Sequence, residues 1–259
     1  MDESTSVTMQ AIPGLPEIRA GDELGAVLAD ALMQADCVLR PGDILVVAHK
    51  VVSKAEGRVV CLDDVVPSAE AERLAAEVRK PAEKIELILR ESQAILRIKP
   101  PRADREAVLI CQHRSGLIMA NAGIDESNVP GERMVVLLPE DADASARRLS
   151  AALRERFGVA PGVVISDTFG RPWRMGLVNV AIGLAGVPGL VDATGGLDAY
   201  GRPLRATVPA FADEVAAAAG LLMQKAAHTP AVLIRGLTWS ASDAGLTPLL
   251  RPVEEDLFR

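Results

Sequence analysis

The chain is poor in aromatic residues, and it has neither paired cysteines nor a long hydrophobic run. Aromatic residues make up 3% of the 259 residues and hydrophobic residues 49%, so aliphatic side chains on helices and strands must fill the core. Cys37, Cys61 and Cys111 are widely spaced and form no C-x-x-C pair. This spacing favours buried reduced thiols over disulfides, redox chemistry or zinc binding.

Two kinds of cellular partner are disfavoured by what the chain lacks. No apolar stretch approaches the roughly 20 residues of a membrane-spanning helix, and the acidic, hydroxyl-rich N-terminus lacks the basic start and apolar run of a secretory signal. We therefore expect a cytoplasmic protein that does not cross a membrane. The net charge of −7 disfavours nucleic-acid binding, because affinity for the phosphate backbone rests largely on basic patches.

Familiar nucleotide and hydrolase motifs are also missing. The chain contains no G-x-x-x-x-G-K-[ST] phosphate loop and no G-x-G-x-x-G between a strand and a helix. It also lacks G-x-S-x-G, and His49, His113 and His228 occupy unrelated contexts, which argues against a serine hydrolase. A nucleotide, if one binds, must therefore occupy an unusual site.

Hydrophobic periodicity indicates a mixture of helices and strands. Helices are predicted at residues 20–35, 68–78, 81–91, 143–157 and 209–226. Strands are predicted at residues 43–48, 94–98, 107–113, 117–121, 163–166 and 231–235, and the turn at 114–116 makes a hairpin of the third and fourth of these. Pro81 suits the first position of its helix, and Gly158 suits the end of the helix before it. The glycine-rich stretch at 176–201 shows no period.

The order of these elements predicts the fold class. Strands and helices mix without steady βαβ alternation, which indicates an α/β or α+β protein, and two lobes built from interleaved segments would fit the same order.

Polar clusters follow three apolar strands, at residues 51–58, 121–128 and 166–171. Ends of strands are where sites commonly form, so the segment 49–58 is predicted to be a site loop, with Asp167 at the exit of its strand. Asp125 and Asp167, with hydroxyl and amide oxygens nearby, are the hard donors that Mg²⁺ or Mn²⁺ prefers. Each aspartate taken alone could instead cap a turn, and Lys54 could contact phosphate or lie on the surface.

Arginine pairs occur in two short Gly-Arg-Pro-x-Arg segments, at residues 170–174 and 201–205. Paired guanidinium groups suit the binding of phosphate or carboxylate, but the same segments also fit turns with solvated arginines. Trp173, within the first of them, is expected to pack in the core.

Taken in order, several segments resemble the F420-0:γ-glutamyl ligase family, and together they cover nearly the whole chain. The resemblance rests on residues 14–18, 42–47, 52–58, 121–128, 166–171, 198–202 and 230–236. It implies an unusual mixed α/β fold that assembles as an intertwined homodimer, and a stand-alone ligase domain over residues 1–259 without a C-terminal flavin-binding domain.

The resemblance also implies a reaction and its substrates. GTP phosphorylates a carboxylate of coenzyme F420-0, and the amine of L-glutamate attacks the resulting acyl phosphate, giving GDP, phosphate and a γ-glutamyl-extended coenzyme. By resemblance, four residues match metal-binding positions: Asp125, Asp167, Thr168 and Gln224. Eight residues match GTP-contacting positions: Leu15, Pro16, Glu17, Ile18, His49, Lys50, Lys54 and Asn128.

Two other functions fit parts of this pattern. A two-metal phosphatase or nucleotide hydrolase would also use Asp125 and Asp167 but would need no glutamate pocket. A non-catalytic homologue would bind nucleotide or F420 without forming an amide. For the ligase we expect Lys54→Ala to weaken GTP binding and leave folding intact, because an exposed lysine rarely supports a core.

Overall fold

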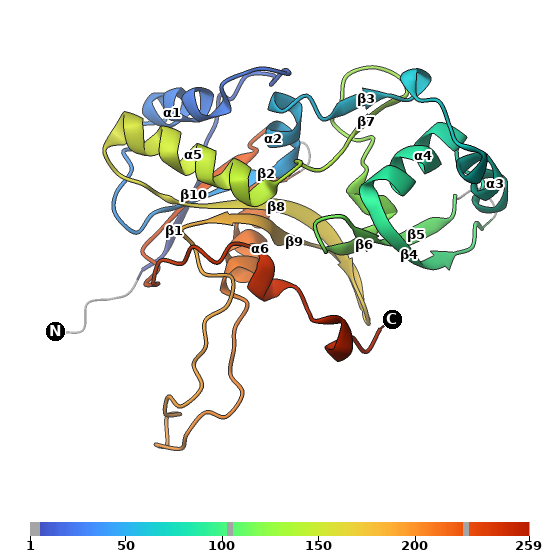
Figure 1. Ribbon diagram of the computed structural model, residues 1–259. Helices are drawn as coiled ribbons and strands as arrows, with labels where there is room; N and C mark the ends of the chain where they lie inside the picture. Colours follow the sequence, from blue (N-terminus) through green and yellow to red (C-terminus); the bar gives the residue numbers. More distant parts are fainter. Residues whose placement is uncertain (1–5, 103–105, 225–227, 259) are drawn as a thin grey trace.

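A five-stranded sheet forms the centre of the molecule, in the order β1, β10, β2, β8, β9 (Figure 1). The structure is a computed structural model that describes residues 6–102, 106–224 and 228–258. The strands of this sheet are β1 (Thr8–Ala11), β10 (Ala231–Arg235), β2 (Ile44–Ala48), β8 (Gly162–Arg171) and β9 (Arg174–Ala185). Strands β2 and β8 run parallel, and the other neighbours are antiparallel.

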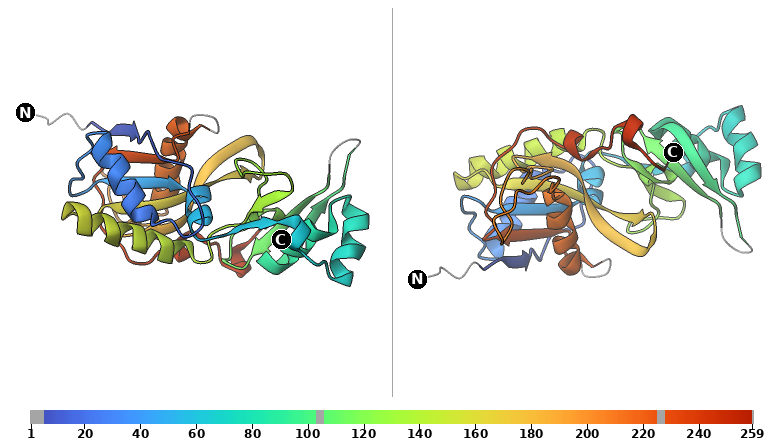
Figure 2. Two further views of the ribbon diagram at one scale, coloured as in Figure 1. Left: turned by 90° about the horizontal axis from the view of Figure 1, so that it is seen from above. Right: turned by 90° about the horizontal axis from the view of Figure 1, so that it is seen from below.

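Helices cover both faces of this sheet. Helices α1 (Leu24–Gln34), α2 (His49–Ala55) and α5 (Ala142–Phe157) lie on one face, and α6 (Phe211–Met223) lies on the other (Figures 1 and 2). Alternate residues of β2 therefore enter different cores: Leu45 and Val47 pack with α1 and α5, whereas Ile44 and Val46 pack with α6. Burial on both faces explains why the strand reads as one continuous apolar run.

A second hydrophobic cluster forms away from this sheet, around α3 (Ala69–Val78) and α4 (Ala82–Glu91). Strands β4 (Ser92–Lys99), β5 (Val108–His113) and β6 (Ile118–Ala120) form an antiparallel sheet there, and β3 (Val59–Cys61) pairs with β7 (Met134–Val136). Short 3-10 segments lie at Leu62–Asp64, Asn121–Gly123, Thr247–Leu249 and Val253–Glu255. The predicted hairpin is the β5–β6 pair, and the mixed α/β class is confirmed.

Both ends of α5 carry capping signals, whereas α4 and α6 begin later than their prolines suggest. The side chain of Asp141 accepts a hydrogen bond from Ala144 N and caps α5, while Gly158, with φ of 73°, ends it in the left-handed region. Pro81 precedes the first residue of α4 rather than occupying it. Helix α6 begins at Phe211 and ends at Met223, and the predicted residues 225–226 lie outside the described residues.

Two predictions about local structure are wrong. The segment 49–58 is mostly helix α2 and not a loop, because seven helical residues are too few for hydrophobic periodicity to reveal. Strand β8 continues beyond residue 166, so Asp167 lies inside it, paired with Val180 of β9. The apolar run ends at Ser166 because pairing with β2 ends there, but the backbone ladder with β9 continues.

The glycine-rich stretch begins inside β9 and continues as a long excursion from the sheet (Figure 1). At Gly183 of β9 a Cβ atom would lie 2.5 Å from the backbone of Ala142, so the close approach of α5 requires glycine. The excursion is closed by backbone hydrogen bonds such as Val191 N to Pro209 O and Ala193 N to Thr207 O.

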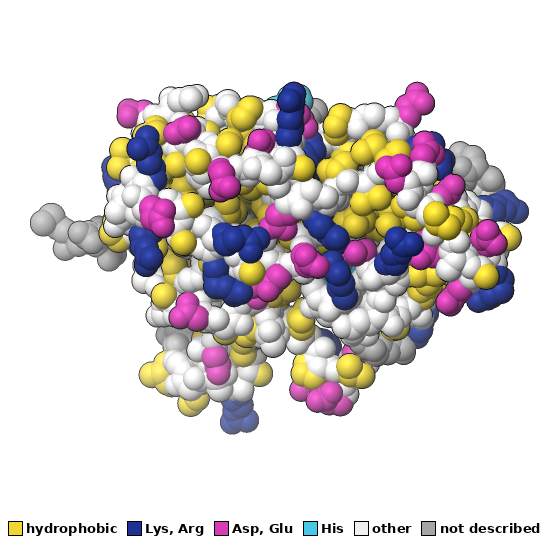
Figure 3. Space-filling view, turned by 45° about the horizontal axis from the view of Figure 1, so that its top comes forward, with side chains coloured by type: hydrophobic (Ala, Val, Ile, Leu, Met, Phe, Trp, Pro, Cys, Tyr) yellow, Lys and Arg dark blue, Asp and Glu magenta, His cyan; other side chains and the backbone are white. Residues whose placement is uncertain are grey.

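Exposed surfaces of the described residues carry both signs of charge. On the face shown in Figure 3, acidic and basic side chains are interspersed without a continuous basic patch. Among the described residues, no helix combines the length and hydrophobicity needed to cross a membrane.

The three cysteines are free. Burial raises the pKa of the Cys37 and Cys111 thiols, whereas Cys61 is partly exposed.

Candidate active site

A cavity of about 590 Å³ lies at the edge of the sheet where β2 and β8 stop pairing. Its walls come from the segment before α1, the start of α2, the base of the β8–β9 ribbon and the end of α6. Eleven of the twelve predicted site residues line it: Leu15, Pro16, Glu17, Ile18, His49, Lys50, Lys54, Asn128, Asp167, Thr168 and Gln224. Only Asp125 is outside the lining, and its side chain reaches Lys50.

A slightly larger cavity, of about 640 Å³, lies between α1 and α5. None of the predicted site residues lines it. The smaller cavity is therefore the candidate site, because the predicted site residues line it and not the larger one.

Parallel pairing of β2 and β8 places the first site residues side by side. Ala48 pairs with Ser166, so the next residue of each strand, His49 and Asp167, leaves the sheet at the same edge. His49 is 2% exposed, and its Nε2 atom lies 3.2 Å from Asp167 Oδ1. This distance suits an ion pair, but the direction does not suit a hydrogen bond, so Nε2 is buried without a hydrogen-bond partner among the described residues.

The next residue of α2, Lys50, holds Asp125. Lys50 Nζ lies 2.7 Å from Asp125 Oδ2 and donates to the backbone oxygen and the hydroxyl of Ser127. Burial is the largest single influence on Asp125 and opposes its ionisation, but hydrogen bonds from Lys50 and Ser127 together outweigh it and lower the pKa of Asp125 to about 2. Asp125 is therefore a carboxylate at neutral pH.

One turn further along α2, Lys54 pairs with Glu17 at 2.5 Å. Lys54 is only 9% exposed, so the alternative of a surface lysine is wrong, and so is the exposure assumed in predicting that Lys54→Ala leaves folding intact. The segment before α1 folds over α2 and buries the lysine stem, which makes Lys54 a structural contact as well as a candidate ligand contact.

Asp167 and Thr168 lie next to each other on β8, and their side chains point to opposite faces of the strand. Asp167 faces α2, where it meets His49. Its Oδ1 atom also accepts a hydrogen bond from Thr168 N at 2.6 Å. Gln224 follows the last residue of α6 and is exposed at the cavity with φ of 23°.

The donor chemistry of these residues suits a hard divalent cation. Asp125 and Asp167 meet consecutive residues at the start of α2, and Thr168 and Gln224 bring further oxygen atoms to the lining of the cavity. The described residues contain no cluster of three or more His, Cys, Asp or Glu side chains able to hold a metal alone. Such a donor set fits a cation whose remaining ligands are phosphate oxygens and water rather than a complete protein cage.

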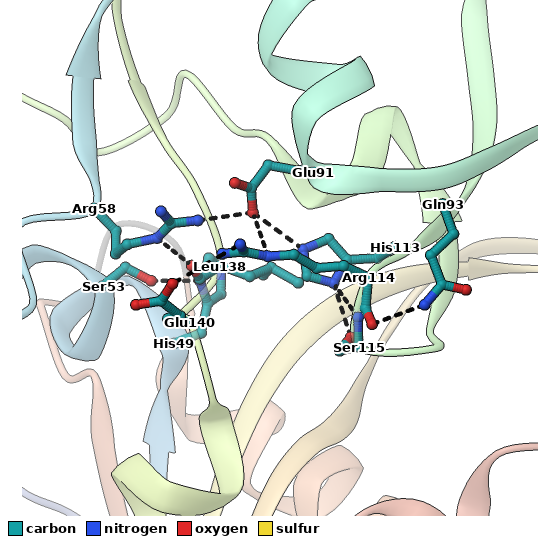
Figure 4. Close-up of polar contacts among 10 residues, drawn as sticks. All are labelled: His49, Ser53, Arg58, Glu91, Gln93, His113, Arg114, Ser115, Leu138 and Glu140. Carbon is teal, nitrogen blue, oxygen red and sulfur yellow. Dashed lines mark hydrogen bonds and ion pairs between the residues drawn. The ribbon is translucent and has the colours of Figure 1, made fainter.

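A second polar cluster lies at the other end of α2, outside the cavity (Figure 4). Three side chains converge on Glu91 Oε2: Arg58 at 2.7 Å, Arg114 at 3.3 Å and His113 at 3.4 Å. Burial opposes ionisation of Glu91, but hydrogen bonds from His113 and Arg58 outweigh it and lower its pKa. Arg58 also donates to Leu138 O, which ties the end of α2 to the segment after β7.

Both arginine pairs lie away from the cavity. Arg171 and Arg174 are exposed at the tip of the β8–β9 ribbon, and Arg202 and Arg205 are exposed on the excursion after β9. Trp173 is 89% exposed at the same tip and contacts the ring of Phe258, so the prediction that it packs in the core is wrong.

Several cavity residues escaped the sequence analysis. They are polar or small side chains on the α6 side: Asn179, Gly220, His228 and Thr229. Asn179 carried a usable signal, since it is a lone polar side chain in the apolar run of β9.

Comparison with known proteins connects this geometry to one family. The sequence profile of the family described as F420-0:Gamma-glutamyl ligase matches residues 14–236. The chain is 42% identical over 256 residues to coenzyme F420:L-glutamate ligase of Methanothermobacter thermautotrophicus, covering 98% of this chain and 99% of the relative. It is 45% identical over 233 residues to the ligase of the same name from Methanopyrus kandleri, covering 90% and 88%. The corresponding protein of Archaeoglobus fulgidus is 40% identical over 249 residues, covering 96% and 94%.

Proposed function

The chain belongs to the F420-0:γ-glutamyl ligase family, and from this premise we propose that it joins L-glutamate to coenzyme F420-0 with GTP as the energy source. One observation carries the proposal. Residues from five separate segments, which the resemblance alone had linked to nucleotide and metal binding, line one cavity in the structure. The number of glutamates added is at least one in this proposal.

The nucleotide is proposed to bind on the α2 side of the cavity. That side is formed by the GTP-contacting candidates: Leu15, Pro16, Glu17, Ile18, His49, Lys50, Lys54 and Asn128. Lys50 and Lys54 already neutralise carboxylates there, so phosphate oxygens would compete with Asp125 and Glu17 for the ammonium groups.

A divalent cation, Mg²⁺ or Mn²⁺, would be held by Asp125, Asp167, Thr168 and Gln224. When bound, it supplies positive charge that neutralises the phosphate oxygens. Asp125 and Asp167 are suited to this role because each is fixed by a neighbour on α2 and one oxygen of Asp167 is fixed by its own strand.

In the proposed reaction, a carboxylate oxygen of F420-0 attacks the γ-phosphorus of GTP, and the bond to the bridging oxygen breaks to release GDP. The amine of L-glutamate then attacks the acyl carbon, phosphate leaves with the bonding electron pair, and the departing phosphate takes the proton that the nitrogen loses. The chain contributes orientation and exclusion of water, because water would hydrolyse the acyl phosphate.

Exposed apolar side chains support a homodimer as the assembly in which this chemistry takes place. Trp173, Met175 and Leu177 protrude from the β8–β9 ribbon, and Leu197 and Tyr200 protrude from the following excursion. Apolar projections of this kind are typical of surfaces that are covered by another chain. We also propose that the chain forms two lobes, which are joined through α2 and β3. The enzyme is proposed to act in the cytoplasm. Sedimentation as a monomer at micromolar concentration would contradict the dimer.

The deciding experiment combines purified protein, F420-0, GTP, L-glutamate and Mg²⁺ or Mn²⁺, with mass spectrometry of the coenzyme. We expect a mass increase of at least one glutamyl residue with GTP and far less product with ATP. GTP turnover that ignores glutamate would instead indicate a hydrolase. No mass increment at saturating substrates and metal would refute the ligase function.

A further inference from the structure

The α6 side of the cavity contains an asparagine with an unusual setting. Asn179 of β9 pairs directly with Thr168 of β8, so the two side chains share one face of the ribbon. Both line the cavity. Asp167, one position earlier than Thr168, points to the other face and meets His49.

Helix α6 leaves room for this asparagine. A Cβ atom on Gly220 would lie 2.8 Å from both Cγ and Oδ1 of Asn179, so a methyl group there would displace the amide. Gly220 lies inside the helix, where glycine is less favourable than alanine. Compared with alanine, glycine at this position lowers the stability of the helix, but it leaves the space that the Asn179 side chain occupies.

The amide is held in place but poorly satisfied. Asn179 Nδ2 donates to Met223 Sδ at 3.8 Å, and Ser166 Oγ donates to the same sulfur at 3.9 Å. A thioether sulfur is a weak acceptor. Among the described residues, the Asn179 side chain makes no other hydrogen bond that the geometry supports, so a ligand oxygen would be a better partner.

The two faces of β8 bring different side chains into the cavity. Val163, Ile165 and Asp167 share the face that packs against α1, α5 and α2. Val164, Ser166 and Thr168 share the opposite face, toward α6. Phosphoryl transfer requires the attacking and leaving oxygens roughly in line across the phosphorus. With the nucleotide on the α2 side, the α6 side is the part of the same cavity that is left for the attacking carboxylate.

We infer that Asn179, given room by Gly220, binds the carboxyl end of F420-0 and orients it toward the phosphoryl group. This inference rests on the proposed function. The uncharged amide donates a hydrogen bond to the carboxylate without pairing it with a cation, which leaves the oxygen able to attack. Ser166 extends the same polar face, since its hydroxyl shares the Met223 sulfur with Asn179.

The test uses two variants that reach the amide by different routes. Asn179→Ala removes it, and Gly220→Ala displaces it while adding a better helix former. Loss of a hydrogen bond to a charged group predicts a rise in KM for F420-0 of roughly ten- to hundredfold in both variants. By calorimetry, the Kd for GTP should stay within about twofold of the unaltered protein. Melting temperature should be unchanged in Asn179→Ala and little changed in Gly220→Ala, where the gain in helix propensity offsets the cost of displacing the amide.

Leu221→Ala is the matched control, because Leu221 is the next residue of α6 and is 68% exposed. It should leave KM for F420-0 unchanged. An unchanged KM for F420-0 in Asn179→Ala would overturn the inference and leave the ligase function standing. So would a variant that weakens GTP binding as much as it weakens F420-0 binding. If the unaltered protein forms no amide, calorimetry with F420-0 alone still decides: binding lost in Asn179→Ala supports the subsite, and binding retained or absent in both proteins overturns it.

Discussion

Asp125 and Glu91 are both carboxylates with lowered pKa values, but their surroundings differ. Asp125 pairs with one lysine and its side chain is 34% exposed. Glu91 is 7% exposed and is enclosed by two arginines and a histidine. A pair that solvent and a ligand can reach is able to exchange its partner, whereas a closed network leaves no room for one. The comparison supports the proposal that Asp125 serves binding, whereas the enclosed Glu91 serves the fold.

His113 strengthens the contrast, because its hydrogen bonds select one tautomer of the neutral ring. The backbone N–H of Ser115 donates to His113 Nδ1 at 3.0 Å, so this nitrogen carries no proton. The proton of neutral His113 then lies on Nε2, facing Glu91 at 3.4 Å. Every group around Glu91 is thus a donor, and the network is complete without a ligand.

The largest expected effect is on catalysis. Asp125→Asn and Asp167→Asn keep the side-chain size but lose charge, so each should lower kcat by roughly a hundred- to thousandfold through loss of phosphate-charge neutralisation. For the ligand-free protein, Asp167→Asn should leave stability nearly unchanged. Asp125→Asn should cost about 1 kcal/mol, since its pair with Lys50 is partly exposed.

Ligation assays and urea unfolding of both variants measure these quantities. Near-normal ligation at unchanged metal concentration would refute the metal-binding role. A large stability loss with retained turnover would show that the aspartates act mainly as turn or cap residues.

The opposite pattern is expected for Glu91→Gln. Removing the charge leaves Arg58 and Arg114 facing a neutral amide in a buried site, which should lower the free energy of unfolding by about 3 kcal/mol. Turnover per folded molecule should stay within a few-fold. Urea unfolding with ligation assays below the transition checks both parts, with Glu77→Gln, an exposed acid on α3, as the control. A stability change as small as that of Glu77→Gln would contradict the structural role.

Sequence patterns predicted the elements that bury apolar residues and missed those that depend on pairing. Strand β2 was found because both of its faces are buried, and α5 was found from its period and its end at Gly158. Asp167 was misplaced because the ladder to β9 is a backbone property that polar side chains do not reveal. Trp173 was misplaced because nothing local distinguishes a ribbon tip from a core strand.

Eleven of the twelve predicted site residues line one cavity, but the contacts among them could not be predicted. Resemblance supplied the residues, while the pairing of Lys50 with Asp125 and of Lys54 with Glu17 joins segments far apart in the chain. Such contacts follow from the arrangement of α2 against its neighbours, which no local pattern specifies. Asn179 stands out locally as a polar residue in an apolar strand, but its contact with Gly220 of α6 depends on the packing of that helix and could not be predicted.

The smallest expected effect is a pH dependence that separates the same two carboxylates. Both have folded-state pKa values below their unfolded values, so each contributes stability that is present above the unfolded pKa, near 4, and is lost as pH falls through the folded pKa. In metal-free buffer, the stability difference between the unaltered protein and Glu91→Gln should therefore be constant from pH 7 to about 5 and shrink below about 4.

The stability difference between the unaltered protein and Asp125→Asn is smaller and should also shrink as the pH falls. Part of it should remain until the pH nears 2, where Asp125 itself takes up a proton. Salt distinguishes the two further: 1 M salt should reduce the Asp125 difference, because an exposed pair is screened, and should leave the Glu91 difference largely intact. Urea unfolding at each pH and salt concentration gives both differences. Two results would contradict this division between a binding carboxylate and a structural one. The first is a stability difference for Glu91→Gln that grows on acidification. The second is a stability difference for Glu91→Gln that 1 M salt removes as readily as that for Asp125→Asn, because Glu91 would then be no more enclosed than Asp125.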